Sequence, residues 1–202
     1  MAINVKKEFK SSETKDNLMR AFAGESQARN RYTFAASQAK EDNLYVISAI
    51  FEYTASQEKE HAEIFYKFLK EMAGETIHVD GGYPVDISAD VTKLLRMAQH
   101  NEYEEHDSVY KSFADKAEEE GFLDIAFSFR QIAKIEKMHG DRFGKFAKLM
   151  EEKKLFVSEV KVKWICLNCG HVYEGETVPE KCPVCQHDKG YFIQLVLSPF
   201  EE

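Results

Sequence analysis

The chain has 202 residues, of which 44% are hydrophobic and 12% aromatic, so it is long enough to bury a sizeable core. Its formal net charge of −8 repels nucleic acid and anionic membrane surfaces, and no cluster of Lys and Arg offsets that charge. The first residues lack the apolar run of a signal peptide, and no stretch approaches the roughly 18 apolar residues of a membrane span. We therefore expect a soluble, cytoplasmic protein with no nucleic-acid or membrane partner.

Four segments before about residue 153 have the composition of long helices, because they are rich in Ala, Glu, Lys, Phe and Leu and contain no Pro. Capping candidates mark the start of the first segment at Ser11, Ser12 and Thr14, and glycines mark the ends of the second and third. We predict helices over residues 11–40, 44–73, 88–121 and 122–153.

The connection between the second and third segments, residues 76–88, contains a Gly-Gly pair and a Pro that exclude helix. Its length lets the chain cross from one end of a bundle to the other. Two helical pairs joined by one long crossover are typical of the ferritin-like bundle, a scaffold that can hold a di-iron centre. We therefore predict an all-α ferritin-like four-helix bundle over residues 1–158.

The remaining residues, 159–202, have a different pattern. The stretches VKVKWIC, CGHVYEG and YFIQLVL indicate short strands around turns. A domain of about 40 residues cannot be stabilised by its core alone and needs a covalent or metal cross-link. We predict a small β-rich domain that is held together in this way.

All four predicted helices carry polar residues at positions that their own periodicity assigns to the inside. Five carboxylates and two imidazoles share these positions: Glu25, Glu58, His61, Glu102, Glu105, Glu136 and His139. An unpaired buried carboxylate costs several kcal/mol, so the group needs compensation. Two divalent metal ions would supply it.

The spacing of these residues repeats within the chain. A glutamate is followed 33 or 34 residues later by a Glu-x-x-His motif in two places: Glu25 with Glu58 and His61, and Glu102 with Glu136 and His139. A single such motif is usually a solvated ion pair, but the duplication favours metal binding. The i, i+3 spacing puts Glu and His on one helical face, so the Glu can bridge two ions while the His binds one.

Iron or manganese suits an oxygen-rich site with one imidazole per ion better than zinc does, and we expect iron. Tyr32 and Tyr110 are predicted as core residues whose hydroxyls meet a carboxylate, with a direct catalytic role as the alternative. Arg29 is predicted to be the charge partner of Glu25. The other histidines fit no ligand spacing: His78, His100, His106, His171 and His187.

The four cysteines form two pairs, Cys166-x-x-Cys169 and Cys182-x-x-Cys185, separated by 12 residues. Four thiolates in this arrangement predict a tetrahedral metal site, and disulfides are the less favoured alternative in a chain without an export signal. Ligand type and geometry permit either zinc or a single iron. Zinc would only hold the domain together, whereas iron would also transfer single electrons.

The stretches AFAGESQARNRY, SQEKEH, NEYEEH, IEKMH, CLNCGHVYEG and CPVC resemble the rubrerythrin family, and the resemblance covers nearly the whole chain. It implies a non-haem di-iron centre in the bundle and a rubredoxin-like FeS4 domain in the tail. It also implies a peroxidase that reduces hydrogen peroxide to water in oxidative-stress defence. Its electrons would come from a donor such as rubredoxin or an NAD(P)H-dependent reductase, and the assembly would be a homodimer.

The resemblance further implies which residues bind the irons. The di-iron ligands would be Glu25, Glu58, His61, Glu102, Glu105, Glu136 and His139, and the FeS4 ligands Cys166, Cys169, Cys182 and Cys185. Glu105 has no counterpart beside Glu25, and the family implies that one iron moves between His61 and Glu105 during turnover. Gln186 departs from the family pattern, because a Gly often follows the last Cys.

Two other functions are compatible with these motifs. The same carboxylate scaffold also activates O2, as in an oxidase or ferroxidase. A protein that sequesters iron, with a structural zinc ribbon as its tail, is a non-enzymatic alternative. Glu105 and the fused redox domain favour the peroxidase.

Overall fold

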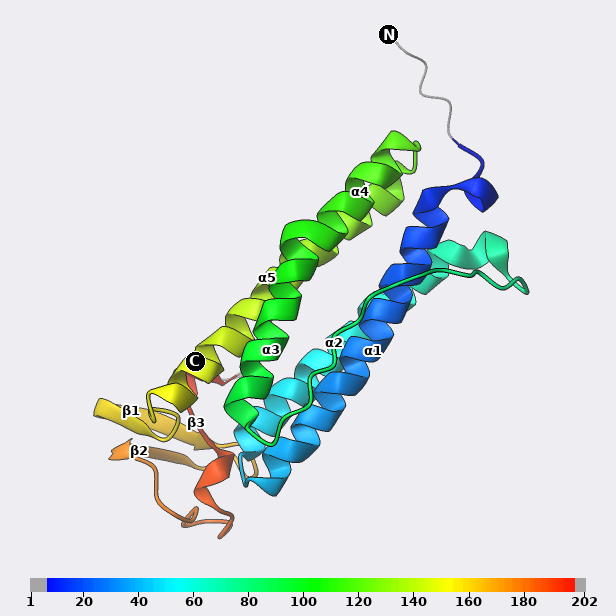
Figure 1. Cartoon of the computed structure of the whole chain (residues 1–202). Coiled ribbons are helices and arrows are strands. Elements are labelled where there is room, and N and C mark those ends of the chain that lie inside the picture. Colours follow the sequence, from blue (N-terminus) through cyan, green and yellow to red (C-terminus); the bar gives the residue numbers. More distant parts are fainter. Residues whose placement is uncertain (1–6, 199–202) are drawn as a thin grey trace.

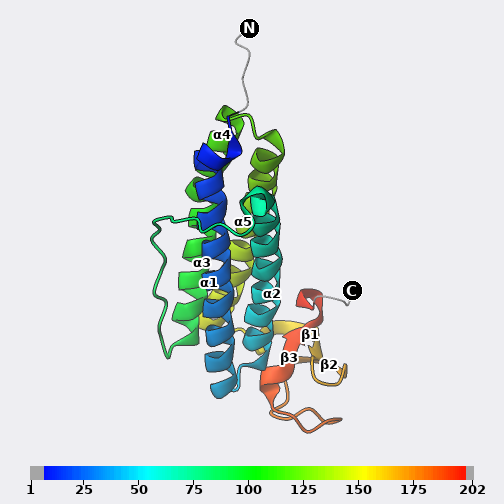
Figure 2. The same ribbon diagram turned by 90° about the vertical axis from the view of Figure 1, so that its right-hand side faces the viewer.

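Long helices run the length of the molecule in the computed structural model, which describes residues 7–198 (Figure 1). Helices α1 and α2 form one antiparallel pair, and α5 packs against α3 and α4 to form the other. The helices are α1 (Glu13–Glu41), α2 (Tyr45–Phe68), α3 (Val91–Glu104), α4 (Tyr110–Glu119) and α5 (Leu123–Glu151). The crossover between α2 and α3 runs along the outside of the bundle (Figure 2), so the predicted ferritin-like arrangement is confirmed.

The ends of the helices differ slightly from the predicted ones. Helix α2 ends at Phe68 and continues as a 3₁₀ turn over Leu69–Met72, before the chain reverses at Gly74. Helix α3 begins at Val91 rather than near Ser88, because Asp90 is the capping residue. Its carboxylate accepts hydrogen bonds from the backbone N–H groups of the first turn, at 2.9 and 3.3 Å.

The third predicted helix is not continuous. A five-residue π-helix, Glu105–Val109, lies between α3 and α4. Such a wide turn inserts extra backbone into a helix and often occurs at functional sites. The prediction of one uninterrupted helix over residues 88–121 is therefore wrong at this point, and the irregularity falls on Glu105.

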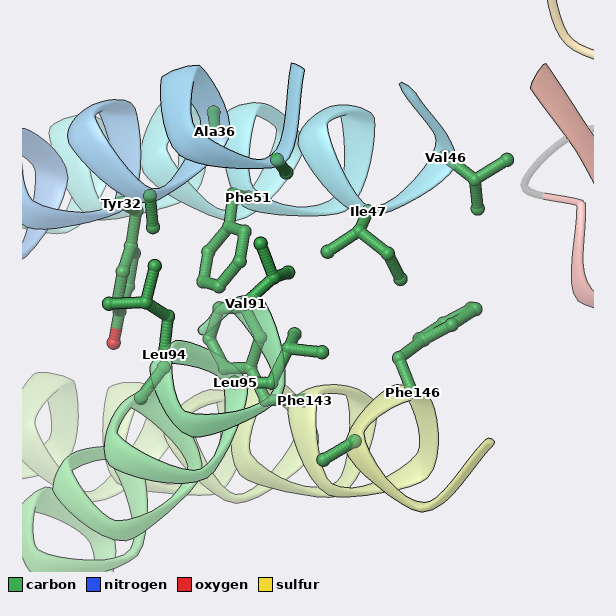
Figure 3. Packing of buried hydrophobic residues seen from close by; sticks show 14 of the residues in the cluster. Tyr32, Ala36, Val46, Ile47, Phe51, Val91, Leu94, Leu95, Phe143 and Phe146 are labelled. Carbon is green, nitrogen blue, oxygen red and sulfur yellow. The ribbon is translucent and has the colours of Figure 1, made fainter. Parts of the chain in front are cut away.

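Two apolar clusters fill the bundle. The cluster nearer the small sheet includes Phe51 and Phe143, whose ring centroids lie 5.1 Å apart between the two helical pairs (Figure 3). The cluster at the far end includes Phe65 and Phe129, with ring centroids 4.9 Å apart. Burying each such ring stabilises the fold by about 2–3 kcal/mol. The predicted metal ligands belong to neither cluster.

The tail forms a three-stranded antiparallel sheet in the order β2-β1-β3. Its strands are β1 (Val157–Cys166), β2 (Val172–Thr177) and β3 (Phe192–Gln194). Trp164 is fully buried in the core of the tail and donates from Nε1 to the carbonyl oxygen of Gly175 at 2.9 Å. Ile165 and Ile193 join the sheet-end cluster of the bundle, which attaches the tail to one end of the helices (Figures 1 and 2).

The boundary between residues 158 and 159 stays a prediction, since the last helix ends at Glu151 and the first strand begins at Val157. Residues 1–6 and 199–202, which the predicted domains include, lie outside the described residues. Within residues 7–198, no helix combines the length and apolar character that a membrane span requires.

Candidate metal centres

Six of the seven predicted bundle ligands meet in the middle of the bundle, each from one of four helices. They form two overlapping groups, and within each group the donor atoms lie within 4.8 Å of one another. One group is Glu25, Glu58, His61 and Glu136; the other is Glu58, Glu102, Glu136 and His139. Glu58 and Glu136 belong to both groups. We refer to these six residues as the carboxylate centre.

The two shared glutamates each turn one oxygen toward each imidazole. Glu58 Oε2 lies 3.2 Å from His61 Nδ1, and its Oε1 lies 2.9 Å from His139 Nδ1. Glu136 Oε1 lies 3.0 Å from His61 Nδ1, and its Oε2 lies 2.9 Å from His139 Nδ1. This is the arrangement that two bridging carboxylates require, and it agrees with the role predicted from the i, i+3 spacing.

The two remaining glutamates occupy equivalent positions at opposite sides of the centre. Glu25 Oε2 lies 3.8 Å from His61 Nδ1, and Glu102 Oε2 lies 3.6 Å from His139 Nδ1. The other oxygen of each accepts a hydrogen bond from a buried phenol: Tyr110 donates to Glu25 Oε1, and Tyr32 donates to Glu102 Oε1 at 2.5 Å. The prediction that Tyr32 and Tyr110 are core residues whose hydroxyls meet a carboxylate is confirmed.

Arg29 does not have the role predicted for it. Its side chain is exposed at the surface, whereas Glu25 is fully buried and is held by the phenol of Tyr110. The spacing of one helical turn misled the prediction, because Arg29 lies just outside the buried face of α1.

Several buried oxygen and nitrogen atoms that could bind metal in the carboxylate centre lack a hydrogen-bond partner in the described part of the chain. They are Glu25 Oε2, Glu58 Oε1, Glu102 Oε2, both oxygens of Glu136, and His139 Nδ1. Buried polar atoms are rarely left without a partner, because their desolvation then goes uncompensated. These atoms converge on one space, so the residues present fit a pair of divalent cations.

The pKa values in the carboxylate centre also indicate a site for cations. Burial, reinforced by the charge of Glu58, raises the pKa of Glu25 to about 8. Burial by itself would lower the pKa of His61, yet the neighbouring carboxylates of Glu25 and Glu58 raise it to about 10. Without a metal, Glu25 and His61 therefore retain protons at neutral pH, and these protons reduce the net negative charge of the carboxylate centre. Metal binding must release them.

Further side chains orient His139. Its Nε2 lies 3.1 Å from Gln57 Oε1, which also accepts from Arg142 Nη1 at 3.1 Å, and Arg142 donates to Thr54 Oγ1 at 2.8 Å. Gln57 thus keeps the proton on Nε2 of His139. The unprotonated Nδ1 is then free to bind a metal in the carboxylate centre through its lone pair. Sequence reasoning missed Gln57 and Arg142. Gln57 directly precedes Glu58, and Arg142 follows His139 by three residues.

Glu105 lies outside both groups, within the π-helix, and is partly exposed. It lines a cavity of about 200 Å³ together with Tyr110. Its partial burial, followed by the charge of Glu25, raises the pKa of Glu105 well above the usual range. Its assignment as an iron ligand stays a prediction.

The four cysteines form the second cluster, which we call the cysteine site. Their sulfurs lie within 4.8 Å of one another, with 3.8 Å between Cys166 and Cys185 and 3.7 Å between Cys169 and Cys182. A disulfide would need about 2.05 Å, and all four, each within the described range, are free thiols. A tetrahedron with metal–sulfur bonds of about 2.3 Å has edges of about 3.8 Å, so the site fits one metal ion.

The two cysteine turns have the same backbone shape. Gly170 N donates to the carbonyl oxygen of Cys166 at 2.8 Å, and Gln186 N donates to that of Cys182 at 2.9 Å. Both donors have left-handed backbones, with φ of +77° for Gly170 and +62° for Gln186. Gln186 thus occupies a conformation that favours Gly, as the departure from the family pattern indicated. The N–H of His187 lowers the pKa of Cys185 to about 6.

The regions that contain the carboxylate centre and the cysteine site both match models of one protein family. The family model described as rubrerythrin matches residues 16–149, and the model described as the rubredoxin-like domain of rubrerythrin matches residues 164–193. The chain belongs to the rubrerythrin family. As in that family, it carries a di-iron site in a ferritin-like bundle and a rubredoxin-like domain with four cysteines suited to one iron ion.

Related proteins cover almost the full length of the chain. A protein of Clostridium perfringens named rubrerythrin is 47% identical over 187 residues, which are 92% of this chain and 96% of that protein. The rubrerythrin of Nitratidesulfovibrio vulgaris is 44% identical over 192 residues, which are 95% of this chain and 99% of that protein.

Solved structures show the same architecture. Nigerythrin in a partially reduced state matches with a TM-score of 0.62 and 28% identity, over 96% of this chain and 91% of nigerythrin. The bacterioferritin of Desulfovibrio desulfuricans matches with a TM-score of 0.55 and 18% identity, over 71% of this chain and 87% of its own. At that identity the second match supports the fold alone.

Proposed function

We propose that this chain is a non-haem di-iron peroxidase that reduces hydrogen peroxide to water in oxidative-stress defence. Electrons would reach the carboxylate centre through the cysteine site. The observation that carries the proposal is the pair of overlapping ligand groups that share Glu58 and Glu136, with a further carboxylate, Glu105, at an adjoining cavity. When bound, two ferrous ions would supply the two electrons that cleave the O–O bond.

Each residue of the centre has a proposed role. Glu58 and Glu136 would bridge the two irons, Glu25 and His61 would complete one coordination sphere, and Glu102 and His139 the other. The iron of the tail would be held by Cys166, Cys169, Cys182 and Cys185. These roles are supported by the distances of the shared carboxylates and by the unpartnered oxygens of the centre.

Tyr32 and Tyr110 would hold protons and orient the terminal carboxylates. Burial, followed by the charge of Glu102 for Tyr32 and of Glu25 for Tyr110, raises the pKa of each phenol well above its usual range. Both phenols therefore stay protonated at neutral pH and keep donating to Glu102 and Glu25. This favours a positioning role over that of a phenolate base.

Glu105 and His61 are the proposed catalytic pair, and each would be able to hold the same iron ion. Ferric ion prefers a hard anionic oxygen, whereas ferrous ion accepts neutral imidazole. The π-helix supports this assignment, because wide turns of this kind are frequent at functional sites and Glu105 is at its first position.

We further propose a homodimer in which the tail of one chain approaches the carboxylate centre of the other. Within one chain the tail contacts α2 at Tyr45, whose ring stacks on Tyr191 with centroids 4.0 Å apart. His61 follows Tyr45 by 16 residues (61 − 45) on the same helix, which is about 24 Å at 1.5 Å per residue. Transfer within one chain is therefore disfavoured. The external donor would be rubredoxin or an NAD(P)H-dependent reductase.

The test is anaerobic stopped flow with the reduced, iron-loaded protein. Hydrogen peroxide and O2 are mixed with it separately, and the absorption bands of both iron centres are followed. We expect peroxide to oxidise both centres rapidly and O2 to act much more slowly. Faster reaction with O2 would instead support an oxidase or ferroxidase, and a tail that binds only zinc would support iron sequestration.

A further inference from the structure

The crossover between α2 and α3 runs along the outside of the bundle (Figures 1 and 2). It lines a cavity that Glu105 also lines. The cavity has a volume of about 200 Å³ and is walled by α1, α3, the π-helix, α4 and the crossover. The crossover contributes four consecutive residues to its lining: Gly81, Gly82, Tyr83 and Pro84. The inner wall includes Tyr110, whose hydroxyl is bonded to Glu25, so the cavity adjoins the carboxylate centre.

Two anchors of unequal strength hold this part of the crossover. At one end, Arg20 donates to the Asp80 carboxylate at 2.8 Å and to the Asp80 carbonyl at 3.2 Å, but Asp80 is 94% exposed. At the other end, Asp86 accepts from Arg31 and from Asn101 Nδ2 at 2.7 Å, and it is only 14% exposed. Exposed ion pairs contribute little to stability, so the Asp80 end is the weaker one.

The ring of Tyr83 lies between these anchors and packs against α1. Its hydroxyl donates to the Arg20 carbonyl at 3.3 Å, and its Cε1 is 3.9 Å from where a side chain on Gly24 would begin. A Cβ on Gly81 would lie 2.8 to 3.0 Å from the outer atoms of Tyr83. Because glycine has no side chain, the Tyr83 ring fits at this position. Tyr83 thus covers the α1 side of the cavity at Gly24, the residue that precedes Glu25 in the sequence.

We propose that Tyr83 is a specificity-determining residue, whose ring admits hydrogen peroxide to the carboxylate centre and excludes bulky organic hydroperoxides. This inference rests on the peroxidase function proposed above. A cavity of about 200 Å³ holds a few molecules of the size of water, at about 30 Å³ each, but is smaller than the pockets of about 300 to 1,000 Å³ that bind drug-sized ligands.

The aromatic packing of the bundle makes this side the natural entrance. Along the bundle axis the carboxylate centre is closed on one side by Phe51 and Phe143 and on the other by Phe65 and Phe129, all four of them fully buried. Moving any of these rings would disrupt the core. Tyr83, by contrast, lies at the surface, where the residue is 41% exposed and lines the cavity.

Two substitutions open the cavity in different ways. Tyr83→Ala removes the ring, whereas Gly81→Ala keeps the ring but displaces it. Two controls leave the ring in place: Tyr83→Phe loses only the hydroxyl, and Val85→Ala changes an 81% exposed side chain of the same crossover. We expect the ratio of the oxidation rates by cumene hydroperoxide and by hydrogen peroxide to rise about tenfold in the first two and to stay near the wild-type value in the controls.

A second readout does not depend on peroxide chemistry. Release of iron from the bundle to the bulky chelator bathophenanthroline should be several-fold faster in Tyr83→Ala and Gly81→Ala than in Val85→Ala. If the wild-type protein does not react with peroxide, the proposed function fails, and iron release still tests the role of Tyr83. If peroxide reacts but neither the rate ratio nor iron release changes in the two opening variants, the role of Tyr83 is overturned and the proposed function stands.

Discussion

The carboxylate centre and the cysteine site are built in opposite ways. The carboxylate centre draws six residues from four helices and lies between two apolar clusters that pack independently of it. The cysteine site is formed by two short turns within 20 residues (166 to 185), and the core beside it is small. The comparison indicates that the bundle positions its metals, whereas the metal of the tail holds the tail together.

Loss of the tail's metal should have the largest effect. In Cys182→Ser we expect the sheet to unfold while the bundle keeps its helices, because a structural metal contributes about 10 kcal/mol or more to such small domains. Trp164 is the only tryptophan of the chain and is fully buried in the tail, so its emission should shift to the red. Far-UV circular dichroism of the helices should change little.

The matched control for this experiment is Val184→Ala, in the same turn, whose side chain is 65% exposed. It should leave the Trp164 emission unchanged. An emission spectrum of Cys182→Ser identical to that of the wild type would show that the tail folds without its metal and would remove the contrast between the two sites.

Within the carboxylate centre, a shared glutamate should matter more than a terminal one. Glu136→Ala should lose both bundle irons, because its two oxygens face the two imidazoles at 3.0 and 2.9 Å. Glu102→Ala should weaken only the iron beside His139. Iron analysis with the cysteine iron as internal standard measures both. Glu104→Ala, an exposed neighbour on α3, is the control, and equal losses in the Glu136 and Glu102 variants would contradict the bridging assignment.

The bundle should also show stability that does not depend on metal. Glu120 accepts from Lys7 Nζ at 2.8 Å and from the backbone N–H of Glu13 and Thr14 at the start of α1, at 3.1 and 2.8 Å. Although burial opposes it, these hydrogen bonds lower the pKa of Glu120 to about 2. Glu120→Gln should therefore destabilise the metal-free protein by about 2 kcal/mol at neutral pH.

The sign of the pH dependence follows from the lowered pKa. The stability that Glu120 contributes is fully present above the unfolded-state pKa of about 4.3 and is lost as the pH falls toward 2. Urea unfolding of the metal-free protein should therefore show the wild type and Glu120→Gln converging over that range. Glu119→Gln, at an exposed neighbouring position, should track the wild type at every pH. A constant difference between the wild type and Glu120→Gln would exclude this role.

The smallest effect concerns the strained turn of the cysteine site. Gln186→Gly should relieve the left-handed backbone and stabilise the metal-loaded tail by up to about 1 kcal/mol. Slower loss of metal from the cysteine site to a chelator would report this gain. Gln186→Ala is the control, because it keeps a Cβ and loses only the hydrogen bond from Nε2 to the Pro183 carbonyl. A gain in the Ala variant equal to that in the Gly variant would exclude backbone strain as the cause.

Sequence reasoning located the helical pairs and the crossover, but it missed the π-helix at Glu105–Val109. The residues there have ordinary helical composition, and a wide turn is stabilised by tertiary contacts that no local pattern reports. The same limit explains Arg29, for which spacing along α1 could not distinguish the edge of the buried face from its centre. It also explains Gln57 and Arg142, whose roles depend on α2 meeting α5.

The sequence by itself determined the residue types that bind metal and their local spacing. The period of the helix puts Glu58 beside His61 and Glu136 beside His139, and each Cys-x-x-Cys turn puts two thiols close together. The same helical spacing predicted that Glu58 and Glu136 can each bridge two ions. Only the tertiary structure decided which phenol meets which terminal carboxylate, Tyr110 with Glu25 and Tyr32 with Glu102. Local spacing follows from backbone geometry, whereas these pairings depend on which helical faces pack together, and packing is set by the whole core.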